Sequence, residues 1–120
     1  METRARKNKI EKDVFEELCC AIGRECVCDN IEERECYSFD TTNVKSMPDL
    51  VITPHSTEQV SSVLSIANKH NISICTRKAG IYLAGGAVPI KGGIALDLKN
   101  MNRIVELNAR DLTISVEPGV

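Results

Sequence analysis

The stretch PDLVITPHSTEQVSSVLSIANKHNISIC, residues 48–75, decides the fold. It opens with the apolar run Leu50 to Ile52, which Pro54 ends, and this is the pattern of a buried strand. It closes with a second short apolar run, Ile72 to Cys75. A helical pattern separates the two runs, so the sequence predicts a strand-helix-strand unit, which favours parallel strands.

The helix of this unit carries a start signal, an apolar stripe and an end signal. Ser56 lies three residues before Gln59, a capping-box pair that satisfies free backbone amides at a helix start. Asn71 closes the pattern. The inward stripe follows helical spacing and consists of Val60, Val63, Leu64 and Ala67.

An N-terminal helix precedes this unit. Residues Lys9 to Ile22 carry apolar side chains at four-residue steps, and Gly23 stands where a left-handed cap ends a helix. The stripe consists of Ile10, Val14, Leu18 and Ile22, with Phe15 alongside. Arg24 to Met47 shows no period and is predicted to be a loop.

Three short strands are predicted towards the end of the chain: Ile94 to Leu98, Ile104 to Leu107 and Leu112 to Glu117. In the last of them Leu112, Ile114 and Val116 alternate with polar residues. This alternation predicts that one face of that strand is buried.

A glycine-containing loop joins the two halves of the chain. It reads TRKAGIYLAGG from Thr76 to Gly86 and continues into VPIKGGIALDL. Glycine permits positive φ and close approach of the backbone, and successive amides then form a concave anion site. The loop is neither a P-loop nor a dinucleotide fingerprint. Two interpretations stay open: a cradle for a cofactor phosphate, or two plain turns at Gly85–Gly86 and Gly92–Gly93.

Length and charge set the class of protein. The 120 residues form at most one domain, with 42% hydrophobic and 27% charged residues, as in ordinary globular proteins. A net charge of -2 gives no reason to expect nucleic acid as a partner. No apolar run is long enough to span a bilayer and no secretion signal is seen, so a cytoplasmic location is expected. The basic cluster Arg4, Arg6, Lys7 and Lys9 is interpreted as a solvated terminus.

Six cysteines are many for this length: Cys19, Cys20, Cys26, Cys28, Cys36 and Cys75. Without an export signal their thiols are expected to be reduced. A zinc site is the alternative, but the Cys-x-x-Cys spacing is missing and adjacent Cys19 and Cys20 point about 100° apart on a helix. No metal is therefore predicted, and the cysteines are interpreted mainly as small apolar residues.

Several of these motifs, in this order, resemble a known family. The runs PDLVITPHSTEQVSSVLSIANKHNISICTRKAG and LAGGAVPIKGGIALDLKNMNRIVELNARDLTISVEPGV are similar to the N-terminal part of the FAD-binding domain of FAD-linked oxidases of the vanillyl-alcohol oxidase type. The likeness is greatest to the branch that contains the flavin subunit of glycolate oxidase and D-lactate dehydrogenase. YSFD, Tyr37 to Asp40, resembles the stretch that precedes the domain in that branch.

The resemblance implies an α+β fold: residues 48–120 as the first subdomain of a PCMH-type FAD-binding domain, and residues 1–47 as a helix and loop extension. FAD would lie between two subdomains, with its pyrophosphate on the backbone of the loop from Arg77 to Gly86. The substrates of the branch are 2-hydroxy acids, from which a hydride passes to flavin N5. The positions carried over as cofactor-binding are Arg77, Lys78, Ala79, Gly80, Gly85, Gly86, Pro118 and Gly119.

Four loop positions depart from the family pattern. Lys78, Ile81, Tyr82 and Ala84 stand where the family commonly has glycine, threonine, glycine or serine, and serine. A left-handed Lys78 would add about 1 to 2 kcal/mol of strain. The two lost hydroxyls would each remove roughly 0.5 to 1.5 kcal/mol. We therefore expect weakened FAD affinity, which a direct pairing of Lys78 with phosphate would partly offset.

The resemblance also implies that the second FAD subdomain and the substrate-binding cap are not in this chain. We expect a portion that is inactive alone, with exposed apolar surface. The alternatives are a half-domain completed by a partner chain and a non-enzymatic cysteine-rich module that binds metal or protein. No catalytic residue is assigned, because His55 and His70 lie at helix ends, where solvated or capping roles are usual.

Overall fold

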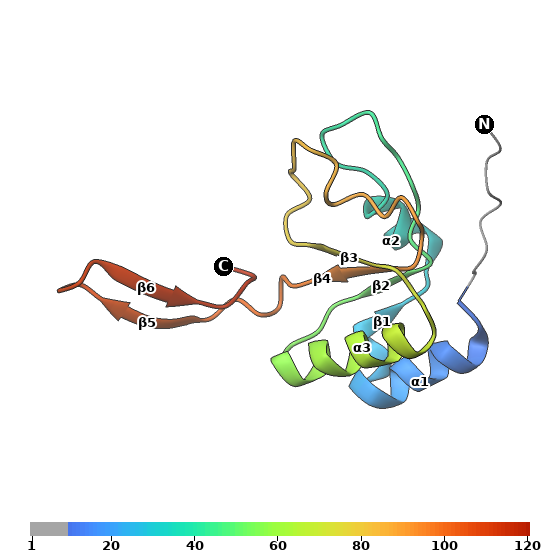
Figure 1. Cartoon of the computed structure of the whole chain (residues 1–120), viewed down its shortest axis with the longest axis horizontal. Helices are drawn as coiled ribbons and strands as arrows, with labels where there is room; N and C mark the ends of the chain where they lie inside the picture. The colour runs from blue at the N-terminus through green and yellow to red at the C-terminus, as the bar shows by residue number, and fades with distance from the viewer. Residues whose placement is uncertain (1–9) are drawn as a thin grey trace.

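A computed structural model describes residues 10–120 (Figure 1), and the basic cluster at residues 4–9 lies outside them. A four-stranded sheet forms its centre, and a separate two-stranded hairpin ends it. The elements in chain order are α1 (Lys12–Ile22), the 3-10 turn η1 (Arg24–Cys26), β1 (Val27–Cys28), α2 (Ile31–Cys36), β2 (Leu50–Ile52), α3 (Thr57–Lys69), β3 (Ile74–Arg77), β4 (Ile94–Asp97), β5 (Ile104–Asn108) and β6 (Thr113–Val116).

The sheet has the order β1-β2-β4-β3. Both strands of the predicted strand-helix-strand unit run parallel to β4, which lies between them, and β1 pairs with β2 in the antiparallel sense. The predicted parallel arrangement is confirmed. The second strand begins at Ile74 rather than Ile72, because Ile72 still belongs to the helix end, where its amide donates to Ala67 O at 2.8 Å.

The predicted start and end of α3 are confirmed. Ser56 Oγ accepts from the Gln59 amide at 3.3 Å, while Gln59 Oε1 accepts from the His55 amide at 2.7 Å. The pair thus satisfies two amides at the helix start. The helix stops at Lys69, and Asn71 takes φ 54°, a left-handed conformation that turns the chain towards β3.

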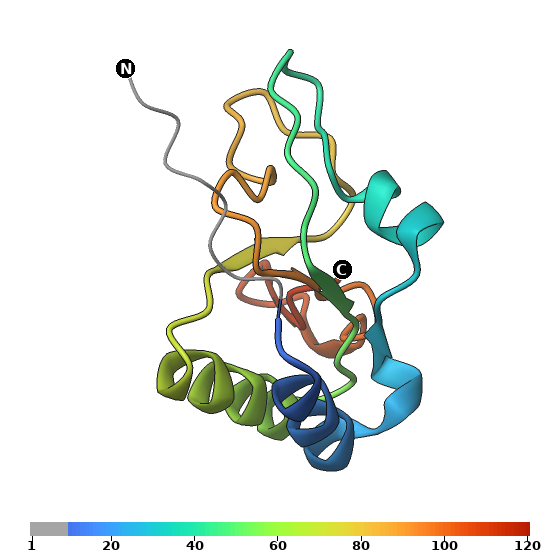
Figure 2. The ribbon, with the colours of Figure 1, turned by 90° about the vertical axis from the view of Figure 1, so that its right-hand side faces the viewer.

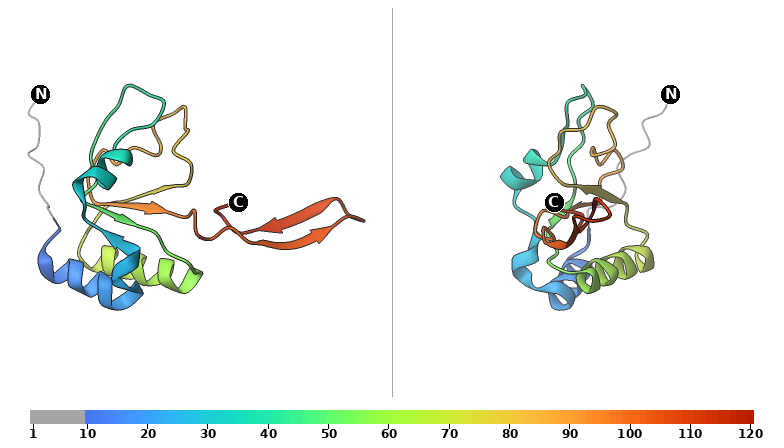
Figure 3. Two further views of the ribbon diagram at one scale, coloured as in Figure 1. Left: turned by 180° about the vertical axis from the view of Figure 1, so that it is seen from behind. Right: turned by 90° about the vertical axis from the view of Figure 1, so that its left-hand side faces the viewer.

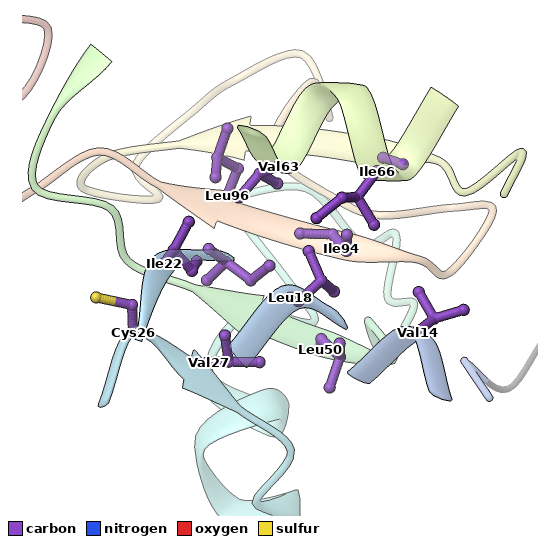
Figure 4. Close-up of a cluster of buried hydrophobic side chains, with 12 residues drawn as sticks. Val14, Leu18, Ile22, Cys26, Val27, Leu50, Val63, Ile66, Ile94 and Leu96 are labelled. Atoms are coloured by element: carbon purple, nitrogen blue, oxygen red, sulfur yellow. The ribbon is translucent and has the colours of Figure 1, made fainter. Parts of the chain in front are cut away.

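Helices α1 and α3 pack side by side on one face of the sheet (Figure 2). Alternate strand residues point to them: Leu50 and Ile52 of β2, and Ile94 and Leu96 of β4. The fully buried Leu18 of α1 belongs to the same cluster (Figure 4), so the N-terminal helix is part of the core. On the opposite face Val51 and Ala95 pack against Tyr37.

The prediction of loop throughout Arg24 to Met47 is wrong, because η1, β1 and α2 fall within it. Helix α2 is short and buries none of its residues, so no hydrophobic period marks it. Its start does have a signal. Asn30 Oδ1 accepts from the amides of Glu32 at 2.8 Å and Glu33 at 3.2 Å, which is an N-cap.

The β5–β6 hairpin projects away from the sheet and the helices (Figures 1 and 3). The prediction that one face of the last strand is buried is wrong for this chain, since Leu112 is 90% exposed and Ile114 55%. The alternation is real, but among the described residues no layer covers either face of the hairpin. Its exposed apolar side chains are Ile104, Val105, Leu107, Leu112, Ile114 and Val116.

Candidate functional site

The glycine-containing loop leaves the carboxyl end of β3 and returns through residues 78–93 to the start of β4. The carboxyl ends of β3 and β4 lie side by side, with Arg77 opposite Asp97 and the Leu98 amide donating to Arg77 O at 3.0 Å. Ligands of parallel sheets gather outside this edge of the strands. The loop thus stands where a bound molecule is expected.

Most amides in the first half of the loop are unpaired. Among residues 10–120, the backbone N–H groups of 79–84 and of 86–87 form no hydrogen bond. The second half is turned on itself, with the Val88 amide on Gly85 O at 3.1 Å and the Gly92 amide on Pro89 O at 2.8 Å. The interpretation as plain turns therefore fits the second half, and the first half keeps its donors available.

The two central glycines differ in conformation. Gly85 has φ +76°, which favours glycine, while Gly86 has an ordinary φ and open space where a Cβ would stand. Beside them lies a hollow of about 260 Å³ between the loop and β3, lined in part by Cys75 and Lys91. Cys75 Sγ donates to Gly86 O at 3.3 Å, and burial raises the pKa of this thiol. The open surface at Gly86 is accessible to a ligand.

Lys78 and Tyr82 contact each other within the loop. The Lys78 amide donates to the Tyr82 hydroxyl oxygen at 3.1 Å, so a side chain of the loop uses one of the loop's own donors. Lys78 does not have a positive φ, and the strain considered for a left-handed lysine is absent. Its side chain is exposed and available to an anion. Ile81 and Ala84, the positions without the family's hydroxyls, are also exposed.

Arg77 is directed into the protein. It is 8% exposed, its Nη1 donates to Phe39 O at 3.2 Å, and its guanidinium carbon lies 5.0 Å from the centre of the Tyr37 ring. A Cβ on Gly80 would fall 1.8 Å from Nη2, so Gly80 gives this side chain its room. The Nε atom is buried and, among the described residues, has no hydrogen-bond partner.

Asp40 is the second buried charge at the loop. Its Oδ1 accepts from the Thr42 amide at 2.7 Å and the Thr42 hydroxyl at 2.6 Å. These bonds, hydroxyl first, hold the pKa of Asp40 below its usual value, and the Gly85 amide and the Arg77 charge lower it further. The Gly85 amide lies outside hydrogen-bonding geometry all the same, and Oδ2 is buried without a partner among residues 10–120.

Tyr37 ties the same segment to the sheet edge. Its hydroxyl donates to Asp97 Oδ2 at 2.6 Å, and Lys99 Nζ donates to the Tyr37 oxygen at 3.3 Å. Burial, followed by the bond to Asp97, raises the pKa of Tyr37. The YSFD segment is therefore anchored on the strand end from which the loop departs. The family resemblance included this segment but assigned it no role.

Pro118 and Gly119 reach the same edge from the end of the chain. The Gly119 amide donates to Met101 O at 2.7 Å, and a Cβ on Gly119 would fall 2.3 Å from Leu98 O. Gly119 is buried and Pro118 is exposed. Both groups of predicted site residues, the loop and this turn, thus lie at the carboxyl edge of β3 and β4.

The cysteines are dispersed. Cys26 is in the core, Cys20 and Cys36 are exposed, and Cys28 Sγ lies 3.0 Å from Glu33 Oε2. Within residues 10–120 there is no group of three or more His, Cys, Asp or Glu side chains placed to hold a metal ion. No helix in the same range has the length and apolar character to cross a membrane.

Comparison with known proteins supplies the context of this site. A family model described as "FAD binding domain" matches residues 48–120. Glycolate oxidase subunit GlcD of Bacillus subtilis (strain 168) is 42% identical over 112 residues, 92% of this chain and 24% of that protein. D-lactate dehydrogenase of Anaerostipes hadrus is 29% identical over 114 residues, 94% of this chain and 24% of that protein.

Among solved structures, p-cresol methylhydroxylase with bound substrate superimposes with a TM-score of 0.81 at 29% identity, over 90% of this chain and 22% of that one. The chain thus spans about a quarter of the length of the curated relatives described above. The expected α+β fold and FAD as the cofactor are confirmed. With the family model covering 48–120, the chain belongs to the FAD binding domain family.

Proposed function

We propose that this chain provides the diphosphate-binding part of an FAD-dependent oxidoreductase that acts on a 2-hydroxy acid of the glycolate or D-lactate kind. The observation that carries the proposal is the run of unpaired amides at the carboxyl edge of β3. Unpaired N–H groups in a concave backbone segment fit an anionic diphosphate. The similarity to GlcD and D-lactate dehydrogenase supports the substrate class.

The proposed cofactor-binding residues act in three ways. Ala79, Gly80, Gly85 and Gly86 offer backbone amides, and Gly86 leaves space for the phosphate oxygens. Lys78 pairs with a phosphate through its exposed ammonium group. Arg77 is buried and contributes positive charge from inside the loop rather than a direct contact.

Pro118 and Gly119 are proposed to lie near the flavin ring, because their turn packs on Leu98 beside the loop. When bound, FAD accepts the hydride from the substrate carbon. This chain's share is to hold the cofactor and to shield it from water on one side. We propose no catalytic residue within it.

We further propose that residues 48–120 act as the first FAD subdomain and residues 1–47 as an extension that supports it. The second subdomain and the substrate cap come from residues outside this sequence, in the same protein or in a partner chain. The composition supports a cytoplasmic protein without nucleic-acid partners, since the net charge is only -2.

FAD titration followed by flavin fluorescence tests the proposal. Gly86→Val is the sharpest variant, because φ is ordinary and nothing lies within 4 Å of the new Cβ, so the side chain fills the cradle without straining the backbone. We expect at least about tenfold weaker binding, a loss of ~1.4 kcal/mol. Gly85→Val should weaken binding too, with added strain from its positive φ.

The matched control is Ala109→Val, at the exposed turn of the hairpin, which should bind FAD like the wild type. Equal responses of wild type and Gly86→Val, whether both bind or both fail to bind, would overturn the proposed cradle.

A further inference from the structure

The segment Tyr37 to Thr42 contacts the glycine loop at three separate places. At the root of the loop, Phe39 O accepts from Arg77 Nη1. At its middle, Thr41 Oγ1 donates to Tyr82 O. At its far side, Thr42 Oγ1 is the atom nearest to where a Cβ on Gly85 would stand, 4.0 Å away. A segment outside the matched domain therefore follows the whole length of the unpaired amides.

Asp40 occupies the centre of this contact. One carboxylate oxygen is fixed by two hydrogen bonds from Thr42, which hold the side chain in one orientation. The other oxygen, Oδ2, is buried with no partner among the described residues, and the Gly85 amide and Arg77 both influence the group electrostatically. A buried acceptor without a donor costs free energy, so its burial here favours a role in the contact with the loop.

Arg77 balances the charge of Asp40. Both residues are 8% exposed, and Arg77 Nε is the other buried polar atom without a partner in residues 10–120. An isolated buried carboxylate beside a diphosphate site would repel the ligand. With the guanidinium present, the pair is neutral overall and leaves the amides of the loop as the net attraction for an anion.

We propose that Asp40 is a positioning residue of the FAD site, which holds the Gly85 side of the loop open from below through its carboxylate while Arg77 cancels its charge. The inference rests on the proposed function for its consequence on FAD, but the brace itself is a property of the loop. Asp40 touches no cofactor atom in this account. It acts through Gly85 and Thr42.

The sign of one substitution separates positioning from simple charge. Asp40→Asn removes a negative charge near an anion site, and electrostatics alone would then tighten FAD binding. The amide also presents its NH₂ group to the Gly85 amide and to Arg77, which are themselves donors, so the brace is lost. We expect weaker binding of FAD by about tenfold.

Asp49→Asn is the matched control. Asp49 Oδ2 accepts from the Gly93 amide at 2.7 Å, so it is also an aspartate on a glycine amide of the same loop, but at the distant end. This variant should keep wild-type affinity for FAD. A second pair tests Thr42: Thr42→Val should weaken binding, and Thr42→Ser, which keeps the hydroxyl on Asp40, should restore it.

Hydrogen exchange of the FAD-free chain, resolved by peptide, reads the brace directly. We expect faster exchange across residues 79–88 in Asp40→Asn, and across 90–94 alone in Asp49→Asn. Unchanged exchange over 79–88 in Asp40→Asn overturns the inference, as does FAD binding that is equal to or tighter than that of the wild type. If the wild type binds no FAD, the proposed function fails and the exchange result alone decides the brace.

Discussion

The phenol oxygen of Tyr82 lies 3.1 Å from the backbone nitrogen of Lys78 and accepts its hydrogen bond. The first amide of the loop therefore already has an acceptor when no cofactor is bound. A phosphate oxygen that approaches this amide must displace the phenol. Tyr82 thus competes with the ligand that the rest of the loop is built to receive.

Removing the phenol oxygen should strengthen cofactor binding. In Tyr82→Phe the Lys78 amide loses its internal partner, and FAD affinity should rise by roughly threefold to tenfold, the worth of one ordinary hydrogen bond. Isothermal titration with FAD measures the change. Phe39→Leu, at an exposed aromatic position outside the loop, serves as control, and an affinity for Tyr82→Phe below that of the wild type would contradict the prediction.

Gly119→Ala should destabilise the chain. The new Cβ would stand 2.3 Å from Leu98 O and 2.6 Å from Met101 O, both backbone atoms that cannot move aside cheaply. We expect a loss of about 1 to 3 kcal/mol in the free energy of unfolding, measured by urea denaturation. Gly86→Ala meets open space and should change it by less than ~0.5 kcal/mol. Equal effects of the two substitutions would show that the turn is not closely packed.

The hairpin should make the chain associate in solution. Leu107 and Ile114 stand opposite each other and are 72% and 55% exposed. Exposed apolar strands with open edges favour pairing with other chains. We expect concentration-dependent oligomers in sedimentation velocity experiments, and a shift to monomer for the double variant Leu107→Lys with Ile114→Glu.

The control for this shift places the same charges on the neighbouring polar pair. Asn108→Lys with Thr113→Glu changes charge by the same amount and should leave association unchanged, because these residues add no apolar surface. A wild-type chain that stays monomeric at high concentration would refute the prediction.

Acid should weaken the contact between α1 and α3. Hydrogen bonds from Lys69 and then His70 hold the pKa of Glu17 below its ordinary value of 4.5. A carboxyl whose pKa is lowered by folding stabilises the protein above its unfolded pKa, and this contribution is lost as pH falls through the folded value. Glu17→Gln should therefore be less stable than the wild type at neutral pH, with a difference that closes below pH 4.5.

Urea unfolding across that pH range measures the difference. Glu16→Gln is the matched control, because Glu16 faces only Lys12 at 3.9 Å on the exposed side of the same helix. A gap between Glu17→Gln and the wild type that stays constant with pH would assign the effect to packing rather than charge.

The sequence predicted the parts of the fold that local patterns dictate. Leu50 to Ile52 is apolar on both faces because the strand is covered on both sides, and Ser56 with Gln59 marks the helix start directly. The loop positions followed from glycine spacing and family likeness. The short helix α2 escaped because it buries nothing, although Asn30 followed by Glu33 was a readable cap.

The rest depended on contacts that are distant in sequence. No local pattern shows that the Tyr82 phenol turns back to Lys78, or that Arg77 points inward to Tyr37 rather than outward. Asp40 followed by Thr42 is a turn signal, but its position beside Gly85 arises only when β3 and the YSFD segment meet. The alternation in β6 correctly marked a strand and could not report that the covering layer is absent from the described residues.

The strand order has a consequence for biosynthesis. In the sheet, β3 pairs only with β4, and β2 pairs with β4 and with the two-residue β1. A ribosome that has translated the chain as far as residue 90 has therefore produced both outer parallel strands without the one that joins them. The nascent polypeptide must keep Leu50 to Ile52 from premature aggregation until Ile94 to Asp97 emerges from the exit tunnel.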